Sequence, residues 1–328
     1  MNRAARRQTR PWLGFVIAGI VQGAALTGAT AETFPSRPIR LIVGFTPGGP
    51  ADVPARFIAE HLQTRLGQPV LVENKPGAGG MIALNDVLSQ PRDGYTLQLC
   101  TYFDALNTIL YKNVSYKLAD IAPVTQIAKY YYLLTLAKSL PVDNFDDFLR
   151  YAKSHPSELL YGEVGAGSAQ ELVAHELEKT AGIKTVGVPF KGSAQITQEM
   201  LAGRIHFQVG PPVSVRSFYK SGQLKVVAVT SPKRLDDMPE IPTLIERGVN
   251  VSTYGWLGVC AGAGTPKPVI DILNRNIVAI VQSDDYRVFM DKVGDIAVAN
   301  TPEEFGRVLT ETVDHAAPYI REFQMQIE

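Results

Sequence analysis

The chain has 328 residues, and its 32 Lys and Arg residues balance its 32 Asp and Glu residues, so the formal net charge is zero. This balance disfavours binding to nucleic acid, which requires a basic face, and we expect no nucleic-acid partner. The length exceeds what one hydrophobic core usually organises and suits two α/β domains.

The first 31 residues have the three regions of a secretory signal peptide. Four arginines between residues 3 and 10 form a basic head, residues 12–26 are mostly apolar, and small residues end the segment at Ala31. Gln22 and Gly23 interrupt the apolar stretch, which is shorter than the roughly 20 residues of a membrane-spanning helix. We expect export with cleavage after Ala31, which leaves 28 basic and 32 acidic residues.

The first predicted element of the mature chain is a strand at residues 39–45, which runs into a glycine turn and a helix. The strand is almost wholly apolar, as in a parallel sheet that is covered on both faces. Gly48 and Gly49 end the strand, Asp52 suits the helix start, and Gly67 suits a left-handed cap. Backbone N–H groups and the helix dipole favour a carboxylate or phosphate at such a turn. The alternative is that the glycines serve only the chain reversal.

Strand-like and helix-like segments alternate along the rest of the chain, which predicts parallel sheets with helices on their faces. Further strands are expected at residues 70–72, 96–100, 133–136, 226–229 and 256–260. Helices are expected at residues 83–89, 145–154, 170–181, 193–201 and 269–281.

A second glycine turn at residues 165–168 follows a strand-like segment at residues 159–161. Ser168 can cap the helix that begins near Gln170, and the glycine spacing differs from that of a dinucleotide fingerprint. We interpret this turn as a partner of the first one.

Cys100 and Cys260 are the only cysteines, and each ends a strand-like run. A disulfide is possible in an exported protein, and two separate buried thiols are the alternative. Only the distance between their Cα atoms can decide, because a disulfide requires the two backbones to come close.

The sequence contains no recognisable catalytic or metal-binding pattern. The five histidines are scattered, and after His175-Glu176 the second histidine of a zinc-protease helix is replaced by Lys179. Neither a nucleophile elbow nor a phosphate loop is present. We expect no catalytic residue, no metal and no cofactor. A secreted α/β enzyme that assembles its site from distant residues is an alternative.

Several short motifs together resemble the Bug-type receptors, the periplasmic solute-binding proteins of tripartite tricarboxylate transporters. The first is the turn Phe45-Thr46-Pro47-Gly48-Gly49-Pro50-Ala51-Asp52. The others follow in order along nearly the whole mature chain, at residues 74–80, 93–97, 188–192, 222–225, 239–243, 246–249 and 263–266.

The resemblance implies a two-lobed α/β periplasmic-binding-protein fold, type II-like, with two parallel or mixed sheets, helices on both faces and a ligand cleft between the lobes. The signal peptide would be 1–31, lobe 1 would comprise 32–131 and 255–328, and lobe 2 would be 132–254. Tyr130, Tyr131, Tyr132, Tyr254 and Trp256 would lie beside the hinge, where they either pack between the sheets or stack on the ligand.

The implied function is a periplasmic, monomeric receptor that captures a small organic carboxylate in the cleft. It would deliver this ligand to the membrane subunits of a tripartite tricarboxylate-type transporter. A ligand-sensing subunit of a signalling system would use the same closure and is the alternative. Mono-, di- and tricarboxylates all fit the shared turns, so the identity of the ligand stays open.

The resemblance also implies that the two turns face each other across the cleft and hold the ligand mainly through backbone groups and water. The expected ligand-binding residues are Phe45, Pro47, Gly48, Gly49, Ala51, Asp52, Thr101, Phe103, Gly165, Ala166, Gly167, Ser168, Glu171, Lys191 and His206. We expect Asp52 to cap its helix and brace the turn, because its carboxylate would repel an anion. Glu171 and His206 depart from the family pattern and could form an acid–imidazole pair, which would be either structural or ligand-binding.

Overall fold

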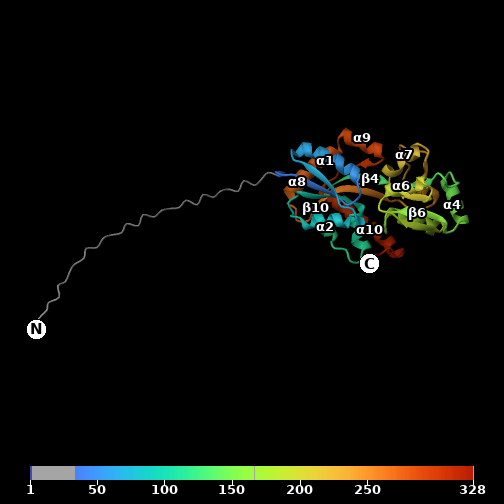
Figure 1. Ribbon diagram of the computed structural model, residues 1–328, viewed down its shortest axis with the longest axis horizontal. Helices are drawn as coiled ribbons and strands as arrows, with labels where there is room; N and C mark the ends of the chain where they lie inside the picture. Colours follow the sequence, from blue (N-terminus) through green and yellow to red (C-terminus); the bar gives the residue numbers. More distant parts are fainter. Residues whose placement is uncertain (2–33, 166, 328) are drawn as a thin grey trace. The chain divides into compact units, whose positions relative to one another are not determined.

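Residues 34–327, apart from Ala166, fold into two β-sheets that helices cover on both faces in the computed structural model (Figure 1). Met1 is the only other residue that the structure describes, so the expected signal peptide and its cleavage after Ala31 lie outside the described residues. None of the helices in the described part of the chain combines the length and the apolar character needed to cross a membrane.

The larger sheet has six strands in the order β11-β4-β10-β3-β1-β2. These strands are β1 (Ile39–Val43), β2 (Val70–Asn74), β3 (Thr96–Thr101), β4 (Ile121–Tyr131), β10 (Tyr254–Gly262) and β11 (Ile296–Ala297). Its helices are α1 (Asp52–Leu66), α2 (Met81–Ser89), α3 (Tyr102–Leu110), α8 (Lys267–Val281), α9 (Asp284–Val293) and α10 (Pro302–Glu322). β1 runs parallel to β2 and β3, whereas β10 is antiparallel to β3 and β4, so the sheet is mixed.

The smaller sheet has five strands in the order β7-β6-β8-β5-β9. These strands are β5 (Leu133–Ala137), β6 (Leu159–Glu163), β7 (Thr185–Pro189), β8 (Phe207–Gly210) and β9 (Leu224–Val229). Its helices are α4 (Phe145–Ser154), α5 (Ala169–Ala181), α6 (Ser193–Leu201) and α7 (Pro212–Lys220). Short 3-10 turns occur at η1 (Ala78–Gly80), η2 (Leu118–Asp120) and η3 (Ile245–Arg247).

Strand β1 shows why its sequence is apolar at almost every position. Its odd-numbered residues Ile39, Leu41 and Val43 lie in the core beneath α1, and Ile42 packs on the opposite face against α2. Successive side chains of a strand point to opposite faces, so a strand that is covered on both faces needs apolar residues throughout. The predicted mixed α/β architecture with helices on both faces is confirmed.

The chain passes twice between the sheets. β4 ends in the larger sheet at Tyr131, and β5 begins in the smaller sheet at Leu133; β9 then returns the chain to β10. We call the larger sheet with its helices lobe 1 and the smaller sheet with its helices lobe 2. The boundaries at 131–132 and 254–255 stay predictions, which this strand order supports.

A disulfide joins Cys100 of β3 to Cys260 of β10, with the two Cα atoms 5.9 Å apart. The two strands are antiparallel neighbours in the larger sheet, and both side chains are buried in the core beneath α10. Strand pairing therefore brings together two cysteines that lie 160 residues apart in the sequence.

We expect the replacement of both cysteines by alanine to lower the free energy of unfolding by about 2–4 kcal/mol, because the crosslink restricts the unfolded chain. Urea unfolding of the double variant measures the loss. Wild-type protein with a reductant is the matched control, since it keeps both sulfur atoms in the core and should lose a similar amount. An unchanged urea midpoint in the double variant and in the reduced protein would contradict the prediction.

Candidate functional site

The first turn, residues 44–52 between β1 and α1, is held from within by the carboxylate of Asp52. This carboxylate accepts the N–H of Gly48 at 2.8 Å, and Arg56 donates to both of its oxygens at 2.8 and 3.0 Å. Asn74 at the end of β2 also donates to Asp52, at 2.8 Å, and donates to the carbonyl of Phe45 at 3.0 Å. The expected bracing role of Asp52 is therefore present in the structure.

The expected capping role of Asp52 is wrong, because the N-cap position of α1 is Ala51 and Asp52 is the first helical residue. Burial of the Asp52 carboxyl disfavours its ionised form, yet the hydrogen bonds from Arg56, Gly48 and Asn74 outweigh burial and lower its pKa. The Asp52 carboxylate is thus ionised, its charge is compensated by Arg56, and both of its oxygens accept hydrogen bonds.

The brace leaves other N–H groups of the first turn without partners. The N–H groups of Asp52 and Val53 donate to the carbonyl of Gly49. Among the residues that the structure describes, the N–H groups of Gly49 and Ala51 have no hydrogen-bond acceptor. Such groups at a helix N-terminus suit an anion.

The second turn, residues 164–168 between β6 and α5, has the same internal arrangement. Glu171 accepts the N–H of Gly167 at 2.6 Å, and the Ser168 hydroxyl caps α5 by accepting the N–H of Glu171 at 3.4 Å. His175 lies one helical turn further, with its Nε2 atom 3.8 Å from Glu171. Ala166, an expected ligand residue, lies outside the described residues.

His175 supplies the positive charge beside Glu171. The carboxylates of Glu171 and Glu178, at 3.8 and 3.4 Å from its ring nitrogens, raise the pKa of His175 to about 9, although burial opposes the shift. In both turns, therefore, an acid four residues after a glycine accepts that glycine's N–H, and a basic residue follows four residues later: Arg56 compensates Asp52, whereas His175 lies between two acids and offsets part of their charge. Glu171 is a brace in the second turn, as Asp52 is in the first.

The expected pair of Glu171 and His206 is wrong. His206 precedes β8, and its Nδ1 atom accepts the N–H of Leu160 at 2.9 Å near the start of β6. The second turn follows the end of β6, at the opposite end of the parallel β6–β8 pair. Burial lowers the pKa of His206, and the imidazole partner of Glu171 is His175 instead.

Three aromatic residues connect the two turns. The rings of Phe45 and Phe103 lie 5.9 Å apart, and those of Phe103 and Tyr102 lie 4.4 Å apart. The Tyr102 hydroxyl donates to the carbonyl of Gly167 at 2.9 Å, which is a direct hydrogen bond between lobe 1 and lobe 2. The structure thus brings together three of the expected residues, Phe45, Phe103 and Gly167, around Tyr102, which was not among the expected ligand-binding residues.

Asp104, which was also not among the expected ligand-binding residues, fixes the start of α3. Its carboxylate accepts the N–H of Thr101 at 2.7 Å, the hydroxyl of Thr101 at 3.3 Å and the amide of Gln98 at 2.8 Å. Burial raises the pKa of Asp104 to about 6, against these hydrogen bonds. The hydroxyl of Thr101, an expected ligand contact, is therefore engaged inside lobe 1. The spacing of Thr101 and Asp104, three residues apart, resembles a capping box and could have revealed this role.

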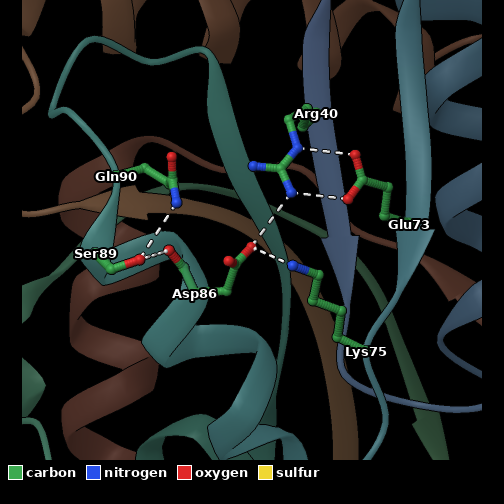
Figure 2. A network of polar contacts seen from close by, with 6 residues as sticks. All are labelled: Arg40, Glu73, Lys75, Asp86, Ser89 and Gln90. Carbon is green, nitrogen blue, oxygen red and sulfur yellow. Dashed lines mark hydrogen bonds and ion pairs between the residues drawn. The ribbon is translucent and has the colours of Figure 1, made fainter.

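The two lysines near the turns have different surroundings. Lys75 forms an ion pair with Asp86 at 3.0 Å (Figure 2). Arg40 lies next to this pair and donates two hydrogen bonds of 2.8 Å to Glu73. Lys75 is therefore part of a brace between β1, β2 and α2. Lys191 is exposed, and its backbone N–H donates to Gln195 at 3.4 Å.

Two cavities lie between the lobes. The turn cavity, of about 150 Å³, is lined by Gly48, Gly49, Pro50, Ala194, Thr197, Gln198, Val213, Ser214 and Phe218. The hinge cavity, of about 330 Å³, is lined by Tyr102, Leu106, Tyr131, Gly167, Ala169, Leu172, Pro232, Ser252, Thr253, Tyr254, Trp256, Glu311, Thr312, His315 and Ala316. The first turn thus borders one cavity and the second turn the other, with Tyr102 beside the second turn. Within the described residues, no group of three or more His, Cys, Asp or Glu side chains could hold a metal ion.

We expect Asp52→Asn to lower the free energy of unfolding at pH 7 by about 1.5–3 kcal/mol, because it removes charge-assisted hydrogen bonds from a buried group. The pKa of Asp52 is lowered in the folded state, so its contribution is present above the ordinary pKa of about 4 and is lost at lower pH. Urea unfolding between pH 7 and pH 3 tests both points. Glu60→Gln on the exposed side of the same helix is the control, and equal stability of the two variants across this range would contradict the prediction.

Comparison with known proteins identifies the family. The sequence model described as the tripartite tricarboxylate transporter family receptor matches residues 54–325. The protein BugT of Bordetella pertussis is 31% identical over 297 residues, which span 89% of this chain and 91% of BugT.

Solved structures show the same fold. Rpa4515 of R. palustris, solved with adipate, superimposes with a TM-score of 0.84 at 32% identity and covers 88% of this chain and 97% of its own. The periplasmic binding protein BugD superimposes with a TM-score of 0.83 at 28% identity and covers 90% of this chain and all of its own. The chain therefore has the two-lobed α/β fold of periplasmic binding proteins and belongs to the receptor family of the tripartite tricarboxylate transporters.

Proposed function

We propose that this chain is a periplasmic receptor that captures a small organic carboxylate between its first and second turns. It then delivers the ligand to the membrane subunits of a tripartite tricarboxylate-type transporter. The observation that carries this proposal is the hydrogen bond from Tyr102 of lobe 1 to Gly167 of lobe 2, because it joins the second turn to α3, whose Phe103 packs on Phe45 of the first turn. Family membership and the adipate bound to a relative of 32% identity support it.

The carboxylate would be held by backbone N–H groups rather than by a buried arginine. Asp52 and Glu171 already occupy one N–H group in each turn, which leaves those of Gly49 and Ala51 and the first N–H groups of α5 to face the ligand. Arg56 compensates the charge of Asp52, and His175 offsets part of the charge of Glu171, which limits the repulsion of an anion. The proposed contacts are Phe45, Pro47, Gly48, Gly49, Ala51, Thr101, Phe103, Gly165, Ala166, Gly167, Ser168 and Lys191.

The protein would be exported, with its signal peptide removed after Ala31, and would act as a monomer without chemical turnover. Three acids near the two turns support the absence of turnover. The carboxylates of Asp52, Asp104 and Glu171 each accept a backbone N–H group of their own lobe. A general acid or base must exchange a proton with the ligand, whereas these three carboxylates are already bonded to the backbone.

A thermal-shift screen of residues 32–328 tests the ligand class, with adipate, succinate, benzoate and glutamate beside their amide analogues. We expect at least one carboxylate to raise the melting temperature and its amide to leave it unchanged, because a ligand that binds only the folded state stabilises it. Recovery of the ligand unchanged tests for turnover. A chain that responds only to neutral or cationic compounds would disprove the carboxylate site, and a converted ligand would show that the protein is an enzyme.

We expect Tyr102→Phe to weaken binding of the carboxylate found in that screen about fivefold, because it removes one inter-lobe hydrogen bond worth about 1 kcal/mol. Isothermal titration calorimetry measures the change. Tyr219→Phe is the matched control, since its hydroxyl donates to Glu240 within lobe 2. Equal affinities of the Tyr102→Phe variant and the control would mean that this hydrogen bond does not contribute to closure.

A further inference from the structure

Asp295, between α9 and β11, is a buried carboxyl group without a hydrogen-bond partner. The residue is 4% exposed, and both carboxyl oxygens lack a hydrogen-bond partner among the described residues. An ionised carboxylate in such a place loses its hydration and gains no hydrogen bond in return, so a buried site of this kind favours the neutral acid.

Next to Asp295, the end of α9 contacts the other lobe. Helix α7 of lobe 2 lies against α9 of lobe 1 (Figure 1). A Cβ atom added to Gly294 would lie 2.6 Å from Pro212 and 2.8 Å from Arg216, both on α7. Arg216 also donates to the carbonyl of Asp291 in the last turn of α9 at 2.9 Å, where a cation is favourable. Separation of the lobes would therefore withdraw α7 and admit water to Asp295.

Arg216 of α7 is the cation whose charge acts on Asp295; its Nε atom has no hydrogen-bond partner among the described residues, and no ion pair joins the two side chains. Tyr130 of β4, Tyr132 and Tyr286 of α9 are neutral, and the buried hydroxyl of Tyr286 has no partner among the described residues. Arg216 of α7 is paired with Asp237 of its own lobe. Burial raises the pKa of Asp295 to about 8, and Arg216 only partly opposes this shift.

We propose that Arg216 and Asp295 are positioning residues that couple lobe closure to the uptake of one proton. Arg216 attaches α7 to the end of α9 by its hydrogen bond to Asp291. In this proposal, α7 packs fully against the region of Asp295 only when the carboxyl group is neutral. This inference rests on the proposed function only in that the lobes of the receptor open and close. It adds that acid favours the closed form and that a rise in pH favours opening and release.

The direction and size of the effect follow from linkage. In the open form Asp295 would meet water and have the ordinary carboxyl pKa of about 4, whereas in the closed form its pKa is about 8. The ratio of closed to open protein should then fall about tenfold for each pH unit between these values. Above pH 8 the carboxyl is ionised in both forms, and the ratio should level off.

The test measures closure of the ligand-free chain. Spin labels on Glu60→Cys of α1 and Lys220→Cys of α7, both exposed positions on different lobes, report the inter-lobe distance by pulsed electron paramagnetic resonance from pH 5 to pH 9. We expect the population with the short distance to fall as the pH rises and to level off near pH 8. A population that stays constant, or that grows with pH, would overturn the proposal.

Three variants separate the roles. Asp295→Asn should keep the short distance at every pH, because its side chain cannot ionise. Asp285→Asn neutralises an exposed carboxyl at the other end of the same helix and should keep the wild-type pH profile. Arg216→Ala should reduce the short-distance population at every pH. A pH profile that survives in Asp295→Asn would overturn the proposal. Because no ligand is added, the result is independent of whether a carboxylate binds.

Discussion

The carboxylate brace inside each glycine turn is the interaction on which the site depends. A turn with two free glycines has many conformations, and binding an anion would have to order it at an entropic cost. Asp52 and Glu171 reduce this cost by fixing Gly48 and Gly167 before any ligand arrives. Each brace also determines which N–H groups remain free to bind a ligand, because its carboxylate accepts one N–H group of the turn.

Charge compensation within each helix makes the arrangement compatible with an anionic ligand. Arg56 and His175 follow their acids by one helical turn; Arg56 compensates Asp52, and His175 offsets part of the charge of Glu171 and Glu178. The dipoles of α1 and α5, whose N-termini lie at the two turns, then make the local electrostatic potential more positive. Several contacts then join the lobes: Tyr102 donates to Gly167, Lys179 donates to Glu322, and Arg216 donates to the carbonyl of Asp291 at the end of α9.

Features set by local sequence could be predicted, and features set by strand register could not. The amphipathic patterns of α4 and α6 gave their boundaries, and the left-handed φ of 66° at Gly67 and the Ser168 cap are confirmed, because each depends on neighbours within one helical turn. The pair of Glu171 and His206 failed because the β6–β8 pairing places His206 beside Leu160. The environment of Asp295 is built from α7, α9 and β4, which are far apart in the sequence. The brace by Glu171 is a different case, since the spacing of residues 167, 171 and 175 repeats that of 48, 52 and 56 and was available in the sequence.

A crystal structure of the mature chain with its carboxylate bound tests the central claim most directly. The account predicts that the carboxylate oxygens accept N–H groups from the first turn and from the start of α5, directly or through one water molecule, while Asp52 and Glu171 keep their bonds to Gly48 and Gly167. A carboxylate held by a lysine or arginine side chain away from both turns, or a turn whose brace is broken on binding, would contradict it.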